Sequence, residues 1–527
     1  MSNGKKVTRR DFMKKTMLAG AAAATGGVLG SREATPAMAA GVPQKWDREV
    51  DVVVVGSGFT GLAAGITAME AGAKVVVLEK AKKAHEGGNS KISGNMWWTP
   101  TNAEDGFTYV KALAFGTTDD ESLKALEAEH VKLNDWLSSK FGVKPAAIGG
   151  LFQPEHPELP GKDCVRTWGN GGRTLNGQLY APIRAYADKI ELEFMYESPA
   201  KELVQAPSGE ILGVKAETAG KPILIKAKRG VVLGCGGFEF DFEMAKQFLP
   251  GWPVYGRGTP YNTGDGIRMC QKVGAALWHM NNTLGGFGCL VVPEYAPVLI
   301  NLGMPADGYI FTDKFGRRFM NEKRDNRHGF GHKEYQLSFD GILGAFTRNP
   351  WWTVFDNATA KKGPVAFARG TTFTWFNAHS GYRWSDDNSA EVTKGWILSA
   401  GDMADLASKM QVNPDVLIKS VGRYNEFCKN KVDTEFERPA ETLIPVEKGP
   451  FYAMKTYSAT YNTQGGPKRN GKCQVLDAFD QPIPRLYSGG EMGSFFGWMY
   501  NGGGNNAEAL LTGKIAGTNV TAEKPRA

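Results

Sequence analysis

The sequence predicts an α/β fold in which parallel strands alternate with helices. Residues 52–55 are four consecutive valines, a run that is typical of a parallel strand buried on both faces of a sheet. An alanine-rich segment follows to about residue 71 and predicts a helix, and residues 74–78 predict a second strand. Glycine is abundant, with 66 residues that cluster in pairs and triples, which indicates tight turns rather than flexible linkers, although loop-rich folds share this pattern.

The turn after the first strand carries the pattern G-x-G-x-x-G, at Gly56, Gly58 and Gly61. In a strand–turn–helix context the first glycine makes the tight turn, the second lets a pyrophosphate approach the backbone, and the third packs the helix on the strand. The second strand leads to Glu79, eighteen residues beyond the last motif glycine, where a carboxylate can bind ribose hydroxyls. The motif therefore predicts a Rossmann-like site for a dinucleotide, either FAD or NAD.

The bulk composition excludes several classes of protein. The chain has 527 residues, enough for more than one domain, and it is 42% hydrophobic and 22% charged, as in ordinary globular proteins. Its net charge of +7 arises mostly from residues 1–39, which hold seven basic and two acidic side chains. The remaining residues hold 55 basic and 53 acidic side chains, a net charge of +2. No nucleic-acid partner is therefore expected.

The six cysteines are scattered and form neither C-x-x-C nor C-x-x-C-H. Zinc-ribbon, iron–sulfur and c-type haem sites therefore lack support, and no metal site is predicted. We expect the cysteines to be buried free thiols, with a single disulfide as the alternative.

The first forty residues have the features of an export signal. The basic segment TRRDFMKK (8–15) is followed by a weakly apolar run and by the cleavage pattern A-x-A at residues 37–39. The apolar run is too short and too rich in glycine and alanine to span a bilayer, so the chain is not expected to be transmembrane. The Arg9-Arg10 pair resembles the twin-arginine signal, whose route exports proteins already folded. We expect cleavage near Ala39 and a periplasmic product; a chance arginine pair in a basic tail is the alternative.

Four further segments follow along the chain: GGNSKISGNMWW (87–98), VVLGCGGFEFD (231–241), NTGDGIRM (262–269) and LYSGGEMG (486–493). Their content and order resemble the FAD-dependent family of fumarate reductase flavoproteins and 3-ketosteroid dehydrogenases, over residues 48–520 with gaps. In that family the GGNS residues meet the flavin and its pyrophosphate, and the glutamate of the last segment holds the ribityl or ribose. Beside Gly56, Gly58, Gly61 and Glu79, the resemblance implies FAD contacts from Lys80, Gly87, Gly88, Asn89, Ser90, Gly94, Gly236, Gly237, Asp265, Glu491, Asn505, Asn506 and Ala507.

The resemblance also implies the domain organisation. It is that of a Rossmann-like FAD-binding domain, discontinuous in sequence, with an inserted α+β capping domain, because flavin motifs lie on both sides of the middle of the chain. The expected parts are a signal peptide (1–39), the first part of the FAD-binding domain (48–280), the capping or substrate domain (281–454) and the second part of the FAD-binding domain (455–527). An amphipathic helical stretch is expected at 402–430.

His85 stands two residues before Gly87. Some relatives in this family bind flavin covalently through a histidine in this region, but there the histidine lies further upstream of the paired glycines. FAD is therefore expected to bind noncovalently.

Two tyrosines stand where the fumarate reductases of this family have basic residues. The segment YNTQGG places Tyr461 at the histidine of a His-x-Thr-x-Gly-Gly motif, and Tyr500 takes the place of an arginine before the last glycine run. A dianionic substrate would then lack charge partners, and unpaired buried carboxylates are costly. The ketosteroid dehydrogenases have a Tyr-x-x-x-Gly pattern, which Tyr500 and Gly504 match. The resemblance implies that the Tyr500 hydroxyl and the Gly504 amide hold a substrate ketone; packing of the Tyr500 ring is the alternative.

The catalytic acid or base is less well defined. In fumarate reductases an arginine four residues after Asn-Glu delivers the proton, and here that offset falls on Asn326, flanked by Arg324, Arg327 and His328. A shift of one residue would make Arg327 the proton donor, and Tyr461 is a second candidate. A surface charge cluster is the alternative.

Five aromatic residues adjoin the flavin segments and predict either a flat apolar pocket for a ring-shaped substrate or ordinary core packing: Trp97, Trp98, Phe495, Phe496 and Trp498.

We expect a periplasmic FAD-dependent oxidoreductase that moves a hydride between flavin N5 and a C–C bond conjugated to a carbonyl, in enone reduction or ketone desaturation. The alternatives are a fumarate- or urocanate-like reductase of an unsaturated carboxylic acid, and a noncatalytic flavin subunit that passes electrons to a partner. Because haem motifs are absent and NAD(P)H is scarce outside the cytoplasm, the external electron carrier is expected to be a cytochrome or quinone-linked.

Overall fold

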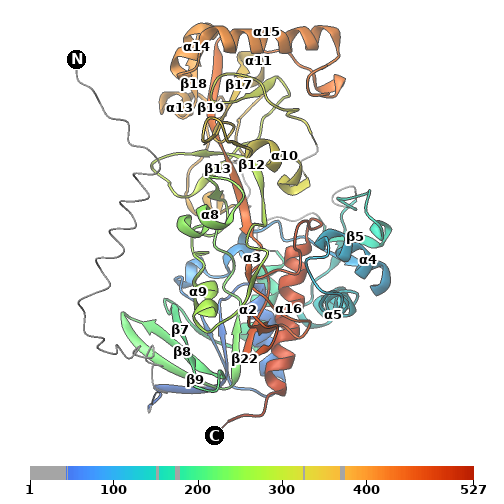
Figure 1. Cartoon of the computed structure of the whole chain (residues 1–527), viewed down its shortest axis with the longest axis vertical. Coiled ribbons are helices and arrows are strands. Elements are labelled where there is room, and N and C mark those ends of the chain that lie inside the picture. Colours follow the sequence, from blue (N-terminus) through green and yellow to red (C-terminus); the bar gives the residue numbers. More distant parts are fainter. Residues whose placement is uncertain are drawn as a thin grey trace, which may run out of the picture. The chain divides into compact units, whose positions relative to one another are not determined.

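The computed structural model describes residue 43 and residues 45–149, 153–172, 178–324, 327–367 and 374–526 (Figure 1). The elements below all belong to the unit formed by residues 44–527. The predicted signal peptide, with its Arg9-Arg10 pair, lies outside the described residues. Within the described ranges, no helix is both long and apolar enough to cross a membrane.

The first sheet has eight strands within the described residues: β1 (Arg48–Val55), β2 (Val75–Leu78), β6 (Glu193–Met195), β7 (Ala200–Gln205), β8 (Ile211–Thr218), β9 (Lys221–Leu233), β21 (Gln474–Leu476) and β22 (Pro482–Ser488). Its order is β21-β22-β9-β1-β2-β6, with β8 paired to β9 and β7 to β8. The strands from β22 to β6 are parallel, and β21, β8 and β7 pair antiparallel. Helix α2 (Phe59–Glu70) joins β1 to β2, which confirms the predicted strand–helix–strand unit.

Both faces of β1 are buried, as its run of valines predicts. Val52 and Val54 share a core with Leu62 of α2, whereas Val53 shares a core with Phe238 on the other face. Side chains alternate between the faces of a strand, so a strand covered on both sides needs an apolar residue at every position.

Helix α16 (Gly504–Ala522) packs along α2, and Figure 1 shows α16 beside the first sheet. A Cβ on Gly513 would lie 2.4 Å from the carbonyl oxygen of Thr60, and one on Gly517 would lie 2.7 Å from that of Ala64. The two glycines are one helical turn apart and let the helix backbones approach closely. This contact places the middle of α16 beside the first turn of α2.

The other elements of this half surround the first sheet. A small sheet has the order β3-β5-β4, and β11 pairs with β20. The bounds are α3 (Gly88–Ile92), β3 (Trp97–Pro100), α4 (Ala103–Ala114), α5 (Asp120–His130), α6 (Leu133–Phe141), β4 (Pro145–Ala147), β5 (Val165–Asn170), α7 (Tyr180–Lys189), α8 (Phe242–Phe248), α9 (Asp265–Lys272), β11 (Leu277–Trp278) and β20 (Gly466–Pro467). Short 3-10 turns lie at Lys83–His85, Lys162–Cys164, Arg327–Gly329 and Ala440–Thr442.

A second sheet is built from the middle of the chain. Within the described residues it has seven strands: β10 (Tyr255–Gly256), β12 (Thr283–Val291), β13 (Leu299–Asn301), β14 (Tyr309–Thr312), β17 (Trp351–Asp356), β18 (Leu398–Ala400) and β19 (Phe451–Thr463). The order is β13-β12-β19-β17-β14, and β10 and β18 also pair with β19. The expected domain boundary at 454/455 lies inside β19, whose full length belongs to this sheet.

Helices flank the second sheet, with α14 (Met403–Met410) and α15 (Pro414–Asn430) at the top of Figure 1. They form the predicted amphipathic stretch. The side chains of Asp402 and Asn413 accept hydrogen bonds from the first turns of α14 and α15, respectively, and thereby cap them. The remaining elements are α10 (Phe330–Gln336), β15 (Phe339–Asp340), β16 (Ala345–Phe346), α11 (Asn357–Ala360), α12 (Trp375–His379) and α13 (Ser389–Thr393).

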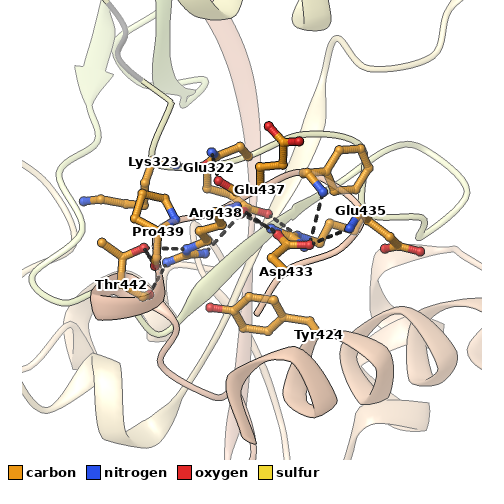
Figure 2. Close-up of polar contacts among 12 residues, drawn as sticks. Glu322, Lys323, Tyr424, Asp433, Glu435, Glu437, Arg438, Pro439 and Thr442 are labelled. Atoms are coloured by element: carbon orange, nitrogen blue, oxygen red, sulfur yellow. Dashed lines mark hydrogen bonds and ion pairs between the residues drawn. The ribbon is translucent and has the colours of Figure 1, made fainter. Parts of the chain in front are cut away.

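A buried ion network joins the second sheet to the segment after α15 (Figure 2). Arg318 Nη2 lies 2.8 Å from both Glu322 Oε2 and Asp433 Oδ2, and Arg438 Nη1 lies 3.1 Å from Glu322 Oε2. Arg438 also donates to the carbonyl oxygen of Tyr309 at 2.8 Å. Two arginines thus balance two carboxylates in a site where an unpaired charge would be costly. The network fixes Arg318 and Glu322 against the segment that follows α15.

All six cysteines are free thiols among the described residues: Cys164, Cys235, Cys270, Cys289, Cys428 and Cys473. Burial raises the pKa of each thiol, which disfavours the reactive thiolate. No group of three or more His, Cys, Asp or Glu residues in the described part of the chain is placed to hold a metal ion.

Candidate active site

A cavity of about 580 Å³, here called the FAD cavity, lies at the carboxyl ends of β1, β2 and β9 and extends to β19. Ligands of open parallel sheets bind at this edge, where strand ends meet helix N-termini. Most of the residues predicted to contact FAD line it: Gly56, Gly58, Glu79, Lys80, Gly87, Gly88, Asn89, Ser90, Gly94, Gly236, Asp265, Glu491, Asn505 and Asn506. Gly61, Gly237 and Ala507 are not among the lining residues.

The glycine turn after β1 leaves room for a phosphate group. Gly56 has a φ of +100°, and a Cβ there would lie 2.3 Å from the carbonyl oxygen of Gly234. A Cβ on Gly61 would lie 1.8 Å from the oxygen of Gly56, so only glycine allows α2 to approach the turn this closely. Gly58 is the N-cap of α2, and a Cβ there would lie 3.2 Å from Ser90 Oγ. Bare backbone at a helix N-terminus suits a pyrophosphate.

Glu79 is held at the end of β2 by three hydrogen bonds. Its carboxylate accepts from Ser57 Oγ at 2.5 Å, from the Ser57 N–H at 3.2 Å and from the Ala81 N–H at 2.7 Å. The next residue, Lys80, pairs with Asp265, with Nζ 2.7 Å from Oδ2. These contacts fix the position of the carboxylate that the sequence predicts to bind a ribose.

Two buried carboxyl groups share amide donors beside the FAD cavity. Asn89 Nδ2 donates to Glu491 Oε1 at 3.0 Å and to Glu239 Oε1 at 3.1 Å. Asn262 Nδ2 donates to the same two oxygens, at 3.1 and 2.8 Å respectively. Burial raises the pKa of both carboxyl groups, and the charge of Glu239 raises the pKa of Glu491 further. Because Glu491 lines the cavity, its protonated carboxyl group can donate a hydrogen bond to a hydroxyl group of the ligand and can also accept a hydrogen bond from it.

Two of the predicted catalytic residues, Tyr500 and Tyr461, line the same cavity from different parts of the chain. Tyr500 precedes α16 and is 4% exposed. Burial, together with the charge of Glu155, raises its pKa well above the usual value, so the hydroxyl remains a donor at neutral pH. Burial also raises the pKa of Tyr461, which lies on β19.

A buried arginine, Arg257, also lines the cavity and is 1% exposed. Its guanidinium carbon lies 4.0 Å from the centroid of the Tyr461 ring. Arg257 follows β10, and the pairing of β10 with β19 brings it to Tyr461. No sequence motif marks this residue, because only the pairing of two distant segments places it. The cavity therefore contains a positive charge, although both positions compared with the fumarate reductases are tyrosines.

A histidine–glutamate pair lies next to Tyr500. His328 Nδ1 is 2.5 Å from Glu155 Oε1, and the ring centroids of His328 and Tyr500 are 5.4 Å apart. Glu155 Oε2 accepts from the N–H of Gly502 at 2.7 Å, which ties the pair to the glycine run before α16. His328 lines the cavity. From the sequence, His328 is noted only because it flanks Asn326. No motif or spacing points to Glu155 as a residue of the site.

The other residues considered for catalysis lie differently. Arg327 forms an ion pair with Glu158, its side chain is 30% exposed, and it is not among the residues that line the cavity. Asn326 lies outside the described residues. The geometry therefore brings His328, rather than Arg327, to Tyr500.

Gly504 opens α16, four residues after Tyr500. Its N–H donates to the carbonyl oxygen of Asn501 at 2.8 Å, within the turn that starts the helix. A Cβ on Gly504 would lie 3.0 Å from Cδ2 of the Tyr500 ring. In this structure Gly504 thus gives the Tyr500 ring room to pack, and its amide hydrogen is used in the turn.

The five aromatic residues near the flavin segments do not line the cavity. Trp97, Trp98, Phe495 and Phe496 are buried in the core shared with α4, α5 and α16, and Trp498 is half exposed. Of the two interpretations of the sequence, core packing is correct for the four buried residues, because β3 and the loop before α16 are covered by helices. The aromatic side chains that line the cavity come from other places and include Tyr261, Phe367, Tyr461 and Tyr500.

The family model described as FAD binding domain matches residues 51–507. The chain belongs to this family. It binds FAD, and the glycine turn, the Glu79 carboxylate and the α16 N-terminus on the cavity wall fit that cofactor. The family membership and the relatives below make it an oxidoreductase that acts on CH–CH bonds.

The chain is similar to several curated enzymes. Digoxin reductase from Eggerthella lenta is 27% identical, over 98% of this chain and 97% of that protein. A 3-oxosteroid 1-dehydrogenase from Mycolicibacterium smegmatis is also 27% identical, over 90% and 98%. Among solved structures, the 3-ketosteroid Δ1-dehydrogenase from Sterolibacterium denitrificans, in complex with 1,4-androstadiene-3,17-dione, has a TM-score of 0.75 at 22% identity and covers 90% of this chain and 100% of its own. The relatives include reductases of fumarate and urocanate as well as ketosteroid dehydrogenases.

Proposed function

We propose that this FAD-dependent oxidoreductase acts on a C–C bond conjugated to a carbonyl group, by reducing an enone or by desaturating a ketone. The observation that supports this most directly is the buried Tyr500 hydroxyl on the wall of the FAD cavity. A neutral phenol in a dry site donates to an oxygen that gains negative charge during the reaction, and such donors stabilise the transition state more than the ground state. FAD, when bound, supplies the two-electron redox chemistry.

The Glu155–His328 pair is suited to hold the proton that enters or leaves the neighbouring carbon. A carboxylate on Nδ1 orients the imidazole ring toward the neighbouring groups. The His328 ring lies beside Tyr500 on the cavity wall, so the donor to the carbonyl oxygen and the proton carrier would act on nearby atoms of one substrate. Tyr461 remains a second candidate, and Arg327 would first have to leave Glu158.

A reductase of an unsaturated carboxylic acid is the second candidate function, and Arg257 is the observation that favours it. A guanidinium can pair with a carboxylate through two parallel hydrogen bonds. Arg257 is buried on the same wall as Tyr461, so a single carboxylate could be compensated there. One arginine balances one charge, which disfavours a dicarboxylate.

The proposal also covers the division of the chain into domains. We interpret the first sheet as a Rossmann-like FAD-binding domain and the second sheet with α10–α15 as a capping domain inserted into it. The neighbours β9 and β22 support this, because they pair in one sheet although the second sheet lies between them in sequence. Noncovalent binding of FAD remains part of the proposal; His85 lines the cavity, with Nδ1 3.0 Å from the Tyr261 hydroxyl.

We further propose that the protein is exported folded by the twin-arginine route and works in the periplasm, on the basis of Arg9-Arg10 and the A-x-A site. An external electron carrier, cytochrome or quinone-linked, would then replace NAD(P)H. These proposals rest on the sequence.

The experiment that tests the proposed function compares two substrates of equal ring size. FAD-loaded protein, reduced without air by a dye, is mixed with cyclohex-2-enone or with cyclohex-1-ene carboxylate, and flavin absorbance is followed. We expect reoxidation of the flavin by the enone and little by the carboxylate. Reoxidation by the carboxylate alone would establish the second candidate function instead.

A further inference from the structure

A second cavity of about 370 Å³, here called the inner chamber, adjoins the FAD cavity on the side of the second sheet. The two cavities share five lining residues: Arg257, Asn301, His328, Phe367 and Tyr461. The inner chamber therefore begins where the proposed carbonyl and proton-transfer groups lie. Its volume is within the range of pockets that hold small organic ligands.

Strand β12 makes room for the inner chamber because glycines face it. Gly286 and Gly288 both line the chamber. A Cβ on Gly288 would lie 3.1 Å from Thr456 Cγ2 and 3.3 Å from Trp351 Cζ2, so even a methyl group would narrow the space between β12, β17 and β19. Much of the remaining wall is apolar or aromatic, with Leu302, Met304, Tyr309, Phe311 and Trp351. This shape and lining suit a ring.

Gln336 Oε1 and Trp351 Nε1, on the chamber wall, are buried polar atoms that have no hydrogen-bond partner within the residues that the structure describes. Gln336 ends α10 and is 1% exposed, and Trp351 begins β17 and is 0% exposed. Leaving such atoms unsatisfied costs free energy, so native proteins rarely do so without a ligand or a water.

A hydrogen bond fixes the orientation of the Gln336 amide, and a close approach to β12 locates the edge of the indole that carries Trp351 Nε1. Gln336 Nε2 donates to the carbonyl oxygen of Gly286 at 3.0 Å; turned round, the amide would set two acceptor oxygens against each other. Of the Trp351 atoms, Cζ2 is the one nearest to a Cβ built on Gly288, and Nε1 lies on the same edge of the indole. An acceptor and a donor are thus both held beside β12, at Gly286 and Gly288.

We propose that the inner chamber binds the end of the substrate remote from the reacting C–C bond, and that this end is a ring bearing a hydroxyl group. A hydroxyl can donate to Gln336 Oε1 and accept from Trp351 Nε1. A carboxylate can only accept, and a hydrocarbon can do neither. The assignment of the two ends rests on the proposed function, because Tyr500 and the FAD cavity define which end reacts.

Two enones that differ by one hydroxyl group test the proposal. They are 4-phenylbut-3-en-2-one and 4-(4-hydroxyphenyl)but-3-en-2-one, whose hydroxyl lies at the end remote from the carbonyl. Their dissociation constants are measured by calorimetry on the FAD-loaded protein with oxidised flavin, which cannot reduce them. We expect the hydroxylated compound to bind at least about tenfold more tightly, because its hydroxyl group would form two hydrogen bonds in the chamber.

Variants locate the preference in the chamber. Gln336→Met keeps the length of the side chain and removes the acceptor, and Trp351→Phe removes the donor. Each should weaken binding of the hydroxylated compound about tenfold and leave the other compound within about twofold. Thr312→Val and Trp278→Phe are matched controls. Each removes a buried polar atom that also lacks a partner in the described part of the chain, and neither residue lines either cavity. Both controls should keep the preference.

Equal binding of the two compounds by the wild-type protein would overturn the proposal, and so would equal weakening of both by Gln336→Met. If Gln336→Met does not fold, Trp351→Phe and the wild-type comparison still decide. Turnover is assayed separately with dye-reduced protein. A hydroxyl preference without reduction of either enone would support the chamber as a binding site while rejecting the proposed reaction.

Discussion

The guanidinium of Arg257 lies 4.0 Å from the centroid of the Tyr461 ring, at the junction of the FAD cavity and the inner chamber. A cation over an aromatic face is attracted by the ring, and more strongly when both are desolvated. Tyr461 occupies the position of a histidine in the fumarate reductases that the sequence resembles. Positive charge in this part of the cavity therefore comes from Arg257, the residue after β10, and its effect on ligands can be tested separately from Tyr500.

The substitution Arg257→Met should separate anionic from neutral ligands. Methionine keeps part of the packing on Tyr461 and removes the charge. We expect inhibition by cyclohex-1-ene carboxylate to weaken at least tenfold, because a carboxylate in a buried site loses its partner, while inhibition by cyclohexanone changes less than threefold. The measurement is a set of inhibition constants for the two ligands. Equal losses for both would mean that Arg257 acts only through packing.

Gly58→Val should abolish retention of FAD. A branched side chain at the N-cap of α2 would crowd Ser90 and occupy the space left for the pyrophosphate. The purified variant should be colourless. Gly422→Val is the control, because Gly422 lies in α15 and a Cβ there meets open space. A yellow Gly58→Val protein with normal flavin content would show that the dinucleotide binds elsewhere.

Glu491→Gln should change the pH dependence of stability in the FAD-free protein. The pKa of Glu491 is raised in the folded state above its ordinary value of 4.5, so the folded state binds more protons than the unfolded state. Stability from this group is present below about pH 4.5 and is lost as the pH rises toward the folded pKa. Glutamine cannot ionise. The melting temperature of the variant should therefore rise relative to that of the wild type as the pH increases from 4.5 to 8. A constant difference between the two melting temperatures over this range would contradict the raised pKa.

The FAD half of the site can be predicted from the sequence because its contacts are local. Gly56, Gly58 and Gly61 lie in one turn, and Glu79 ends the next strand of the same sheet. A short motif with its flanking strand and helix therefore contains most of the geometry.

The substrate half cannot be predicted in this way, because it is assembled from distant segments. Arg257 reaches Tyr461 only through the pairing of β10 with β19, and Glu155 reaches His328 and Gly502 from a loop before β5. The expected domain boundary at 454/455 likewise rests on local motifs alone. Nothing in the local pattern shows that β19 continues in the second sheet to Thr463.

Arg9 and Arg10 should together determine export. Replacing both with lysine keeps the charge of the segment and removes the twin-arginine feature. Folded, FAD-loaded precursor should then accumulate in the cytoplasm, measured by fractionation and flavin absorbance. Lys14→Arg with Lys15→Arg is the control and should leave export intact. An unchanged periplasmic yield of the double lysine variant would remove the twin-arginine assignment.

Tyr500→Phe tests the donor on which the proposed function depends. The substitution keeps the ring that packs beside His328 and on Gly504, so FAD content and thermal stability should barely change. Loss of one such hydrogen-bond donor typically lowers turnover by a factor on the order of 10²–10³, roughly 3–4 kcal/mol, because the bond strengthens as charge develops on the carbonyl oxygen. Steady-state kinetics should therefore show a large fall in kcat and a smaller change in KM. Tyr500→Arg, which restores the basic residue of the carboxylate-reducing relatives, should weaken ketone ligands. Wild-type turnover by Tyr500→Phe would reduce Tyr500 to a packing residue and leave the carboxylate reaction, with Arg257 as its anchor, as the better account of the site.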